Sequence, residues 1–154
     1  MSFDKKETIY IVCQSNDSTG LGHLIRCISL AKCLQKAGQN IQFYGDFSSK
    51  GQVWLENSGL EFVQSSKNIA ELLTVLPSCS NVVLDSYQYD AKDLNPNLNY
   101  VLIDDFCRLT NYLVAGVINF TLMASSFDYQ SKSASTVALG TKYFLPNPSL
   151  SQPV

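Results

Sequence analysis

Short apolar runs alternate with amphipathic stretches along most of the chain, and the two kinds of run predict different elements. The run Thr8–Cys13 is apolar almost throughout, which is typical of a strand that is covered on both faces. The other predicted strands are Ile41–Tyr44, Glu61–Val63, Asn81–Leu84, Tyr100–Ile103 and Gly116–Ile118. Strands that alternate with helices predict an α/β, Rossmann-like fold, with a mostly parallel sheet and helices on both faces.

Three amphipathic stretches predict the helices of this fold. The first should end at Gly38, because glycine readily adopts the conformation that terminates a helix. The second surrounds Val53–Leu55 and ends near Gly59, and the third covers Ile69–Leu76 before Pro77. The apolar stripe of the first helix consists of Leu24, Cys27, Ile28, Ala31 and Leu34.

The chain after residue 124 is less regular. We expect Ser125–Ala138 to be largely loop and Lys142–Leu145 to add an edge strand. A length of 154 residues suits a single domain, which we place at residues 1–145. The remaining residues, 146–154, are rich in proline and serine and predict a tail or a linker to a second domain.

Charge and composition narrow the classes of partner. The 13 acidic and 11 basic residues give a net charge of −2. The chain therefore lacks the excess of basic residues that is typical of proteins that bind nucleic acid or an anionic membrane. No apolar run is long enough to span a bilayer and no secretory signal is recognisable, so we expect a cytoplasmic protein. Five cysteines without a CxxC pair and a single histidine, His23, predict no metal site, and we expect no cofactor.

The densest polar signal follows the first predicted strand, in the segment Gly20–Arg26. Its two glycines allow a tight turn, and the helix that follows presents free N–H groups to an anion. His23 stands in the first turn of this helix, and Arg26 lies three residues further on the same side. A glycine pair alone is common in ordinary turns, and this one is neither a dinucleotide fingerprint nor a P-loop. The histidine and the arginine are what favour a binding site.

Polar residues also end three other predicted strands. Asp85 follows the fourth strand, with Tyr87 two residues beyond it. Asp104 and Asp105 follow the fifth strand, and Asn119 follows the sixth. The carboxyl ends of parallel strands share one edge of the sheet, where ligands of open α/β sheets bind. An aspartate at such a position can also simply cap a turn, but two acidic positions at one edge favour a ligand site.

Taken together, these segments resemble a known family. The segment Gly20–Arg26, continued by Leu30-Ala31 and Leu34, is similar to the GxGHxxRxxxLAxxL signature of the UDP-2,4-diacetamido-2,4,6-trideoxy-β-L-altropyranose hydrolases. These enzymes act in pseudaminic acid biosynthesis and are related to spore-coat polysaccharide proteins and, more distantly, to MurG-like glycosyltransferases. The further segments that resemble the family are Val83–Tyr87, Leu102–Asp105, Ile118-Asn119 and Leu139–Tyr143.

The resemblance implies the N-terminal half of a GT-B fold and hydrolysis of a nucleotide sugar at its anomeric carbon, without a metal or a covalent intermediate. It implies that His23 binds or activates the attacking water, as an imidazole with an ordinary pKa of about 6.5 can do. The glycine turn and the start of the helix could steady the leaving diphosphate. The residues expected to bind the substrate are Gly20, Gly22, Arg26, Asp17, Asp85, Tyr87, Asp104, Asp105 and Asn119.

Two features leave alternatives open. Gln14 stands where the family has an arginine, and the 154 residues correspond only to the first of the two GT-B halves. We therefore expect a nucleotide-sugar hydrolase-like domain that works with a second half, supplied as a domain or a subunit, or that forms a homodimer. The alternatives are a glycosyltransferase subunit and a non-catalytic sugar-binding or scaffold module.

Overall fold

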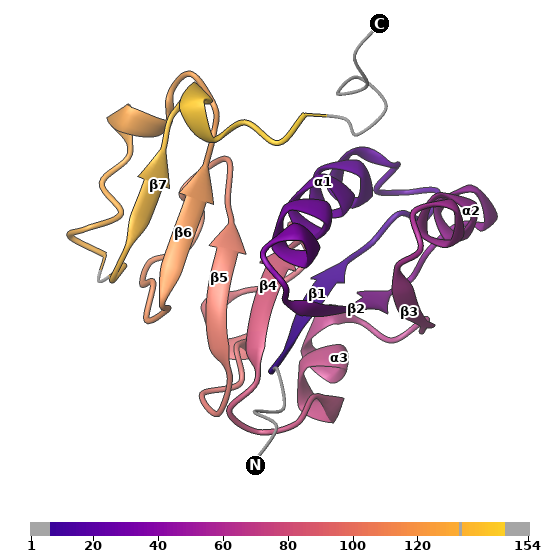
Figure 1. Ribbon diagram of the computed structural model, residues 1–154. Helices are drawn as coiled ribbons and strands as arrows, with labels where there is room; N and C mark the ends of the chain where they lie inside the picture. Colours follow the sequence, from indigo (N-terminus) through magenta and orange to yellow (C-terminus); the bar gives the residue numbers. More distant parts are fainter. Residues whose placement is uncertain (1–6, 133, 147–154) are drawn as a thin grey trace, which may run out of the picture.

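The computed structural model describes residues 7–132 and 134–146, which form a seven-stranded sheet with helices packed against it (Figure 1). All neighbouring strands run parallel, in the order β3-β2-β1-β4-β5-β6-β7. The strands are β1 (Thr8–Cys13), β2 (Asn40–Gly45), β3 (Glu61–Gln64), β4 (Asn81–Asp85), β5 (Asn99–Ile103), β6 (Gly116–Asn119) and β7 (Val137–Leu139). The chain therefore has the α/β, Rossmann-like fold that the alternating pattern predicts.

Three α-helices connect the first four strands, namely α1 (Gly22–Lys36), α2 (Ser49–Asn57) and α3 (Ile69–Val75). The Ser48 side chain caps the start of α2, and Asn68 forms a capping box with Glu71 at the start of α3. Helix α1 begins without a side-chain cap, because the side chain of its N-cap residue, Leu21, accepts no hydrogen bond from the first amide groups of the helix. Within the described ranges, none of the helices combines the length and the apolar character needed to cross a membrane.

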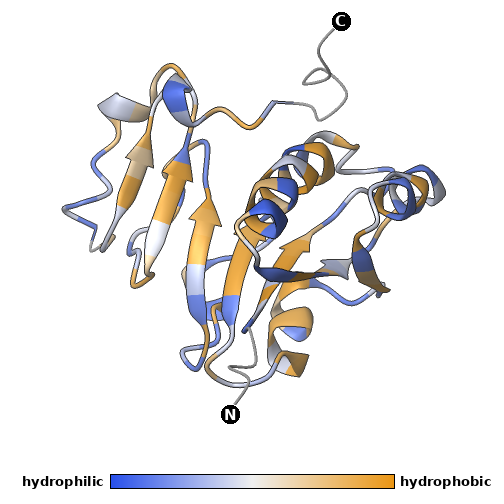
Figure 2. Ribbon diagram, viewed as in Figure 1, coloured by the Kyte–Doolittle hydropathy of each residue, from blue (hydrophilic) through white to orange (hydrophobic). Residues whose placement is uncertain are grey.

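The alternation of side chains along β1 explains how both faces of the sheet are covered. Ile11 and Cys13 belong to the core under α1 and α2, whereas Val12 belongs to the core under α3. All three side chains are fully buried. Figure 2 shows hydrophobic colour along the central strands. The continuous apolar run of this strand thus fits its place between two helical layers.

The other half of the sheet is covered differently. After β4, the described chain contains only short 3₁₀ turns, η1 (Ala91–Asp93), η2 (Ala124–Ser126) and η3 (Thr141–Tyr143), between and beyond its strands. The α-helices gather at the β1–β3 side (Figure 1). Loops close the core on the α3 face with Tyr112 and Tyr129, two buried rings whose centroids lie 5.1 Å apart.

The edge strand of the sheet differs from the prediction. Strand β7 pairs with β6 and lies at the end of Ser125–Ala138, the stretch that we predicted to be loop. The predicted strand at Lys142–Leu145 is wrong, since this segment belongs partly to η3 and is otherwise irregular. Gly140, with a φ of 99°, turns the chain away immediately after β7 and so ends the pairing.

The predicted tail begins where the described chain ends. The carbonyl of Pro146 accepts a hydrogen bond from the hydroxyl of Ser29. This bond ties the segment after η3 to the middle of α1 and places Leu145 beside the core under that helix. The rest of the predicted tail, residues 147–154, lies outside the described residues.

Candidate active site

The order of the strands reverses between β1 and β4. The chain leaves β1 through α1 toward β2 on one side, and it returns through α3 to β4 on the other side. Ligands of open α/β sheets bind at such a switch point, beyond the carboxyl ends of the strands. Cys13, the last residue of β1, pairs with Asp85, the last residue of β4. The segment that leads into α1 therefore starts beside Asp85.

Side chains of α1 converge on Asp85, which is fully buried. Nδ1 of His23 lies 2.6 Å from Oδ1 of this carboxylate. Arg26 forms a two-pronged ion pair with it, from Nε to Oδ2 at 2.5 Å and from Nη2 to Oδ1 at 2.5 Å. The thiol of Cys27 lies 3.5 Å from Oδ2. Residues three and four apart share one face of a helix, so a single carboxylate holds the first turns of α1.

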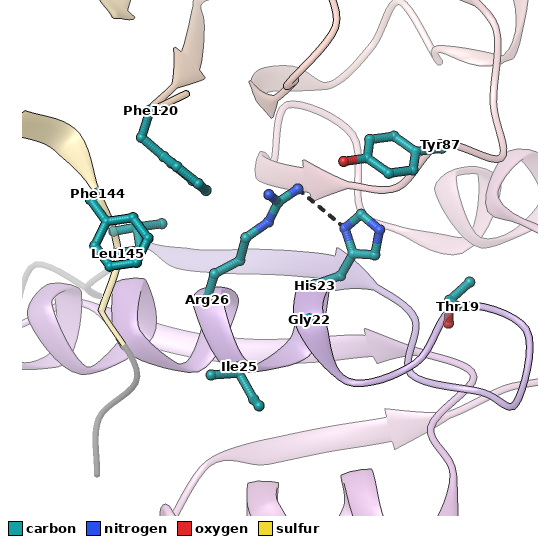
Figure 3. A pocket seen from close by; sticks show the side chains of 9 residues that line it. All are labelled: Thr19, Gly22, His23, Ile25, Arg26, Tyr87, Phe120, Phe144 and Leu145. Carbon is teal, nitrogen blue, oxygen red and sulfur yellow. Dashed lines mark hydrogen bonds between the residues drawn. The ribbon is translucent and has the colours of Figure 1, made fainter. Parts of the chain in front are cut away.

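These partners determine the tautomer of His23. Its Nδ1 lies 2.6 Å from Asp85 Oδ1 and also 3.2 Å from Arg26 Nη2, the contact dashed in Figure 3. A carboxylate can only accept, so Nδ1 carries the hydrogen and donates it to Asp85 in the shorter, charge-assisted bond. The Arg26 contact is then not a hydrogen bond, because both groups are donors. In the neutral ring, Nε2 is left as an acceptor, and none of the described residues hydrogen-bonds to it.

Opposing effects act on the ionisation of this group of side chains. Burial alone would raise the pKa of Asp85, but hydrogen bonds from Arg26 and His23 hold that pKa below its usual range. Burial alone would lower the pKa of Arg26, whereas its bonds to Asp85 and Asp105 raise the pKa above its ordinary value. Both groups are therefore charged in neutral solution. Burial raises the pKa of Cys27, which stays a neutral thiol.

Asp105 brings the end of β5 into the same group. Its Oδ2 accepts a hydrogen bond from Arg26 Nη1 at 2.8 Å and another from the hydroxyl of Tyr87. The Tyr87 ring packs edge-on against His23, with the ring centroids 4.7 Å apart. Burial and the bond to Asp105 raise the pKa of Tyr87 to about 12, so the phenol keeps its proton. We call His23, Arg26, Asp85, Tyr87 and Asp105 the His23 cluster.

A cavity of about 380 Å³ opens on the cluster. His23, Arg26 and Tyr87 form its polar side, and Phe120 and Phe144 lie across from them (Figure 3). Arg26 joins the two sides, because its guanidinium lies 5.2 Å from the centroid of the Phe120 ring. The other lining residues are Thr19, Gly22, Ile25 and Leu145. All of these residues follow β1, β4, β6 or β7, so the cavity lies at the predicted edge of the sheet.

The residues of the predicted turn differ in what they contribute. Gly20 has a φ of +66°, which side chains other than glycine rarely allow. Gly22 has no such requirement, and a Cβ placed there would meet nothing within 4 Å. Because Gly22 lines the cavity, its missing side chain leaves room beside His23. Asp17 is exposed and makes none of the described contacts of the cluster.

Two of the predicted site residues serve the core. Asp104 accepts a hydrogen bond from the hydroxyl of Tyr112, and Asn119 donates one to the hydroxyl of Tyr129 at 2.9 Å. The amide oxygen of Asn119 is also occupied, by the backbone and the hydroxyl of Thr121. Both side chains are buried, and neither lines the cavity. In this structure Asp104 and Asn119 therefore serve the core, and their role in substrate binding stays a prediction.

Sequence reasoning missed the apolar wall of the cavity and a second arginine near the cluster. Phe120 comes two residues after the predicted strand Gly116–Ile118 and directly after β6, so its place at the edge was a signal that could have been used. Phe144 and Arg108 offer no such signal. They reach the site through loops, and the path of a loop depends on the tertiary structure.

The carboxylates of the His23 cluster are paired with an arginine. In the part of the chain that the structure describes, no group of three or more histidine, cysteine, aspartate or glutamate side chains is placed to hold a metal ion. The guanidinium of Arg26 already pairs with Asp85 and Asp105, which occupies the space where a cation would lie between these carboxylates.

Comparisons with known proteins assign no family to the chain. No family model matches the sequence, and neither a curated protein nor a solved structure matches it. The fold and the site geometry define a class of protein: a Rossmann-like α/β domain with a histidine–carboxylate–arginine cluster. The cluster lies beside a cavity at the topological switch point.

Proposed function

We propose that this chain is the hydrolase-like half of a nucleotide-sugar enzyme, in which His23 takes a proton from the water that attacks the anomeric carbon. The observation that carries the proposal is the 2.6 Å contact of His23 with the buried Asp85, at the wall of a cavity on the carboxyl edge. The resemblance of Gly20–Arg26 to the hydrolases of pseudaminic acid biosynthesis supplies the substrate class, a UDP-linked sugar.

His23 has the protonation pattern that such a step requires. Its Nε2 accepts a proton from water while the water oxygen bonds to the anomeric carbon. The bond from that carbon to the diphosphate oxygen breaks, and its electron pair leaves with UDP. Asp85 holds the Nδ1 hydrogen and stabilises the imidazolium that forms, as the carboxylate does in hydrolytic triads. With two carboxylates and one guanidinium in the cluster, the added proton also cancels a net negative charge.

The contacts of Arg26 support a positioning role for this side chain. All three of its guanidinium nitrogens already contact carboxylates, two on Asp85 and one on Asp105. We therefore propose that Arg26 positions these carboxylates and does not bind the phosphates. The leaving diphosphate then meets the uncapped start of α1, where Gly22 leaves room for it beside the first amide groups.

A second half completes the site in this proposal, as a further domain, a separate subunit or a second copy of the chain. Its support is the exposure of large aromatic side chains around the cavity. Phe106 is 59% exposed and Phe144 is 60% exposed, and both follow carboxyl ends of strands. Exposed apolar surface next to a binding site is typical of an interface with another domain or subunit.

Release of UDP from the diacetamido-trideoxy nucleotide sugar tests the proposal, with the chain alone and with a candidate second-half protein added. We expect His23→Ala to lower kcat about 10²–10⁴-fold, because general-base catalysis contributes this much. Lys36→Ala, at the exposed end of the same helix, is the matched control and should not change kcat. Equal turnover by His23→Ala and the unchanged protein would overturn the assignment of the base.

The same assay separates the alternative functions. A glycosyltransferase releases UDP only when a sugar acceptor is added, whereas a hydrolase needs water alone. A non-catalytic module binds the nucleotide sugar in calorimetry but releases no UDP with any partner. One observation favours this last alternative: Gln14 is buried and contacts the Ser86 hydroxyl, so it does not replace the charged contact of the family's arginine.

A further inference from the structure

Arg108 is a cation that the proposed chemistry does not use. Among the described residues it forms no ion pair with a carboxylate. Its guanidinium instead lies 5.6 Å from the centroid of the Tyr87 ring and 5.2 Å from that of the Tyr89 ring. Its two Nη atoms reach the carbonyl oxygens of Ser86 and Tyr89, each at 3.4 Å. These four contacts span the loop that follows β4.

The backbone around Arg108 is held in place from several sides. Cys107 has a φ of 51°, in the left-handed region that residues other than glycine seldom adopt. Lys132 donates hydrogen bonds to the carbonyls of Cys107 and Leu109, at 3.2 and 3.0 Å. The amide of Leu109 donates to the hydroxyl of Tyr112 at 3.1 Å. A strained residue persists only where its surroundings fix it, and such residues concentrate at functional sites.

The ring that Arg108 contacts is the ring that touches His23. Tyr87 packs edge-on against the imidazole, while its hydroxyl bonds to Asp105. The imidazole is thus constrained twice, by Asp85 at Nδ1 and by Tyr87 against the ring. Tyr87 lies on a loop and is 39% exposed, and its aromatic neighbour Phe106 is more exposed still. Arg108 adds a contact to the Tyr87 ring from the loop after β5.

We propose that Arg108 is a positioning residue that holds Tyr87 against His23 and so fixes the plane of the imidazole in the cavity. Its effect on turnover rests on the proposed role of His23, whereas its effect on the geometry does not. A guanidinium suits this task, because it stacks on aromatic faces while its forked N–H groups reach separate carbonyls. Because none of its described partners is a carboxylate, the contacts of its guanidinium are with these rings and carbonyls.

The single histidine of the sequence makes the geometric part directly measurable. The ring protons of His23 give the only imidazole signals in a proton NMR spectrum, and these signals respond to the nearby Tyr87 ring. Tyr87→Leu shows where the signals lie without that ring. We expect the signals of Arg108→Met to move toward those of Tyr87→Leu. The signals of Arg108→Lys, which keeps the charge but loses the fork, should lie between. Lys92→Met, at an exposed position, should leave them in place.

Turnover supplies the second readout. We expect Arg108→Met to lower kcat on the order of tenfold with little change in KM, because a misplaced base slows the chemical step more than it weakens binding. Arg108→Lys should restore part of this loss. Changed His23 signals with unchanged kcat would overturn the role of Arg108 in turnover.

The geometric proposal is overturned if the His23 signals of folded Arg108→Met coincide with those of the unchanged protein. If Arg108→Met does not fold, Arg108→Lys decides by the same comparison, and coinciding signals again overturn the proposal. Failure of the proposed function is a separate result, because it appears as full turnover by His23→Ala and leaves the NMR comparison unaffected.

Discussion

The carboxylate of Asp85 accepts contacts from His23, Arg26 and Cys27, and its bond to Nδ1 determines the tautomer of the imidazole. We expect Asp85→Asn to shift His23 toward the tautomer with hydrogen on Nε2, because the asparagine amide can donate to Nδ1. Nitrogen-15 NMR of the sole histidine measures the tautomer directly. The variant should also lose about 10²–10⁴-fold in kcat.

Glu56→Gln, on the exposed side of α2, is the matched control for Asp85→Asn and should keep both the tautomer and the turnover. An unchanged tautomer in Asp85→Asn would show that another contact sets the orientation of the ring.

Tyr129 links the side chain of Asn119 to the backbone of Asp104, and both residues are buried. Its hydroxyl accepts from Asn119 and donates to the backbone carbonyl of Asp104. Tyr129→Phe leaves both groups buried without this partner, so we expect a loss of about 1–3 kcal/mol in the free energy of unfolding. Urea denaturation measures this change, with the more exposed Tyr143→Phe as a control that stays within about 0.5 kcal/mol. A stability equal to that of the control would contradict the structural role.

The sequence correctly predicts that His23, Asp85 and Asp105 lie at one edge of the sheet, because parallel strands end on the same side. It does not separate Asp105 from Asp104. Adjacent residues at the end of a strand point to opposite faces, and only the strand register decides which face meets α1. In the structure, Asp105 meets Arg26, whereas Asp104 turns to Tyr112 in the other core.

Gly45 at the end of β2 and Gly22 at the start of α1 differ in whether the structure has room for a side chain. A Cβ at Gly45, the last residue of β2, would lie 1.8 Å from the carbonyl oxygen of Cys13, whereas a Cβ at Gly22 would meet nothing within 4 Å. We expect Gly45→Ala to lower the free energy of unfolding by about 1–3 kcal/mol or more. Gly22→Ala should maintain it, or raise it by up to about 1 kcal/mol through better helix propensity.

Gly22→Ala should nevertheless weaken binding of the UDP-linked sugar, because its methyl group occupies the space beside His23. Calorimetric titration of the nucleotide sugar measures this effect. Unchanged affinity would mean that the ligand does not approach the start of α1.

Six of the seven strands were predicted from their apolar residues, and five of these lie inside the sheet, where strands bury apolar surface. Strand β7 was not predicted, because its three residues are too short a run to stand out from a loop. Its place is determined by its pairing with β6, which a local pattern does not show. The apolar segment Tyr143–Leu145 resembles a strand in sequence, but Phe144 and Leu145 instead form a wall of the cavity.

The depressed pKa of Asp85 couples the stability of the whole molecule to pH. The unfolded chain takes up this proton near the ordinary pKa of about 3.9, whereas the folded protein resists it. The contribution is therefore present in full above that unfolded value and is lost as the pH falls through the lower, folded value. We expect the free energy of unfolding to fall less steeply with acidification below about pH 4 in Asp85→Asn than in the unchanged protein. Denaturation at each pH measures this free energy, and parallel curves of free energy against pH for the two proteins would contradict the prediction.

Hydrolysis in ¹⁸O-labelled water is the most direct test of the claim that His23 directs water at the anomeric carbon. With the second half present, the account predicts that the label enters the released sugar and not UDP, and that His23→Ala slows this incorporation. Label in the phosphate of UDP, or equal incorporation by His23→Ala, would contradict the account.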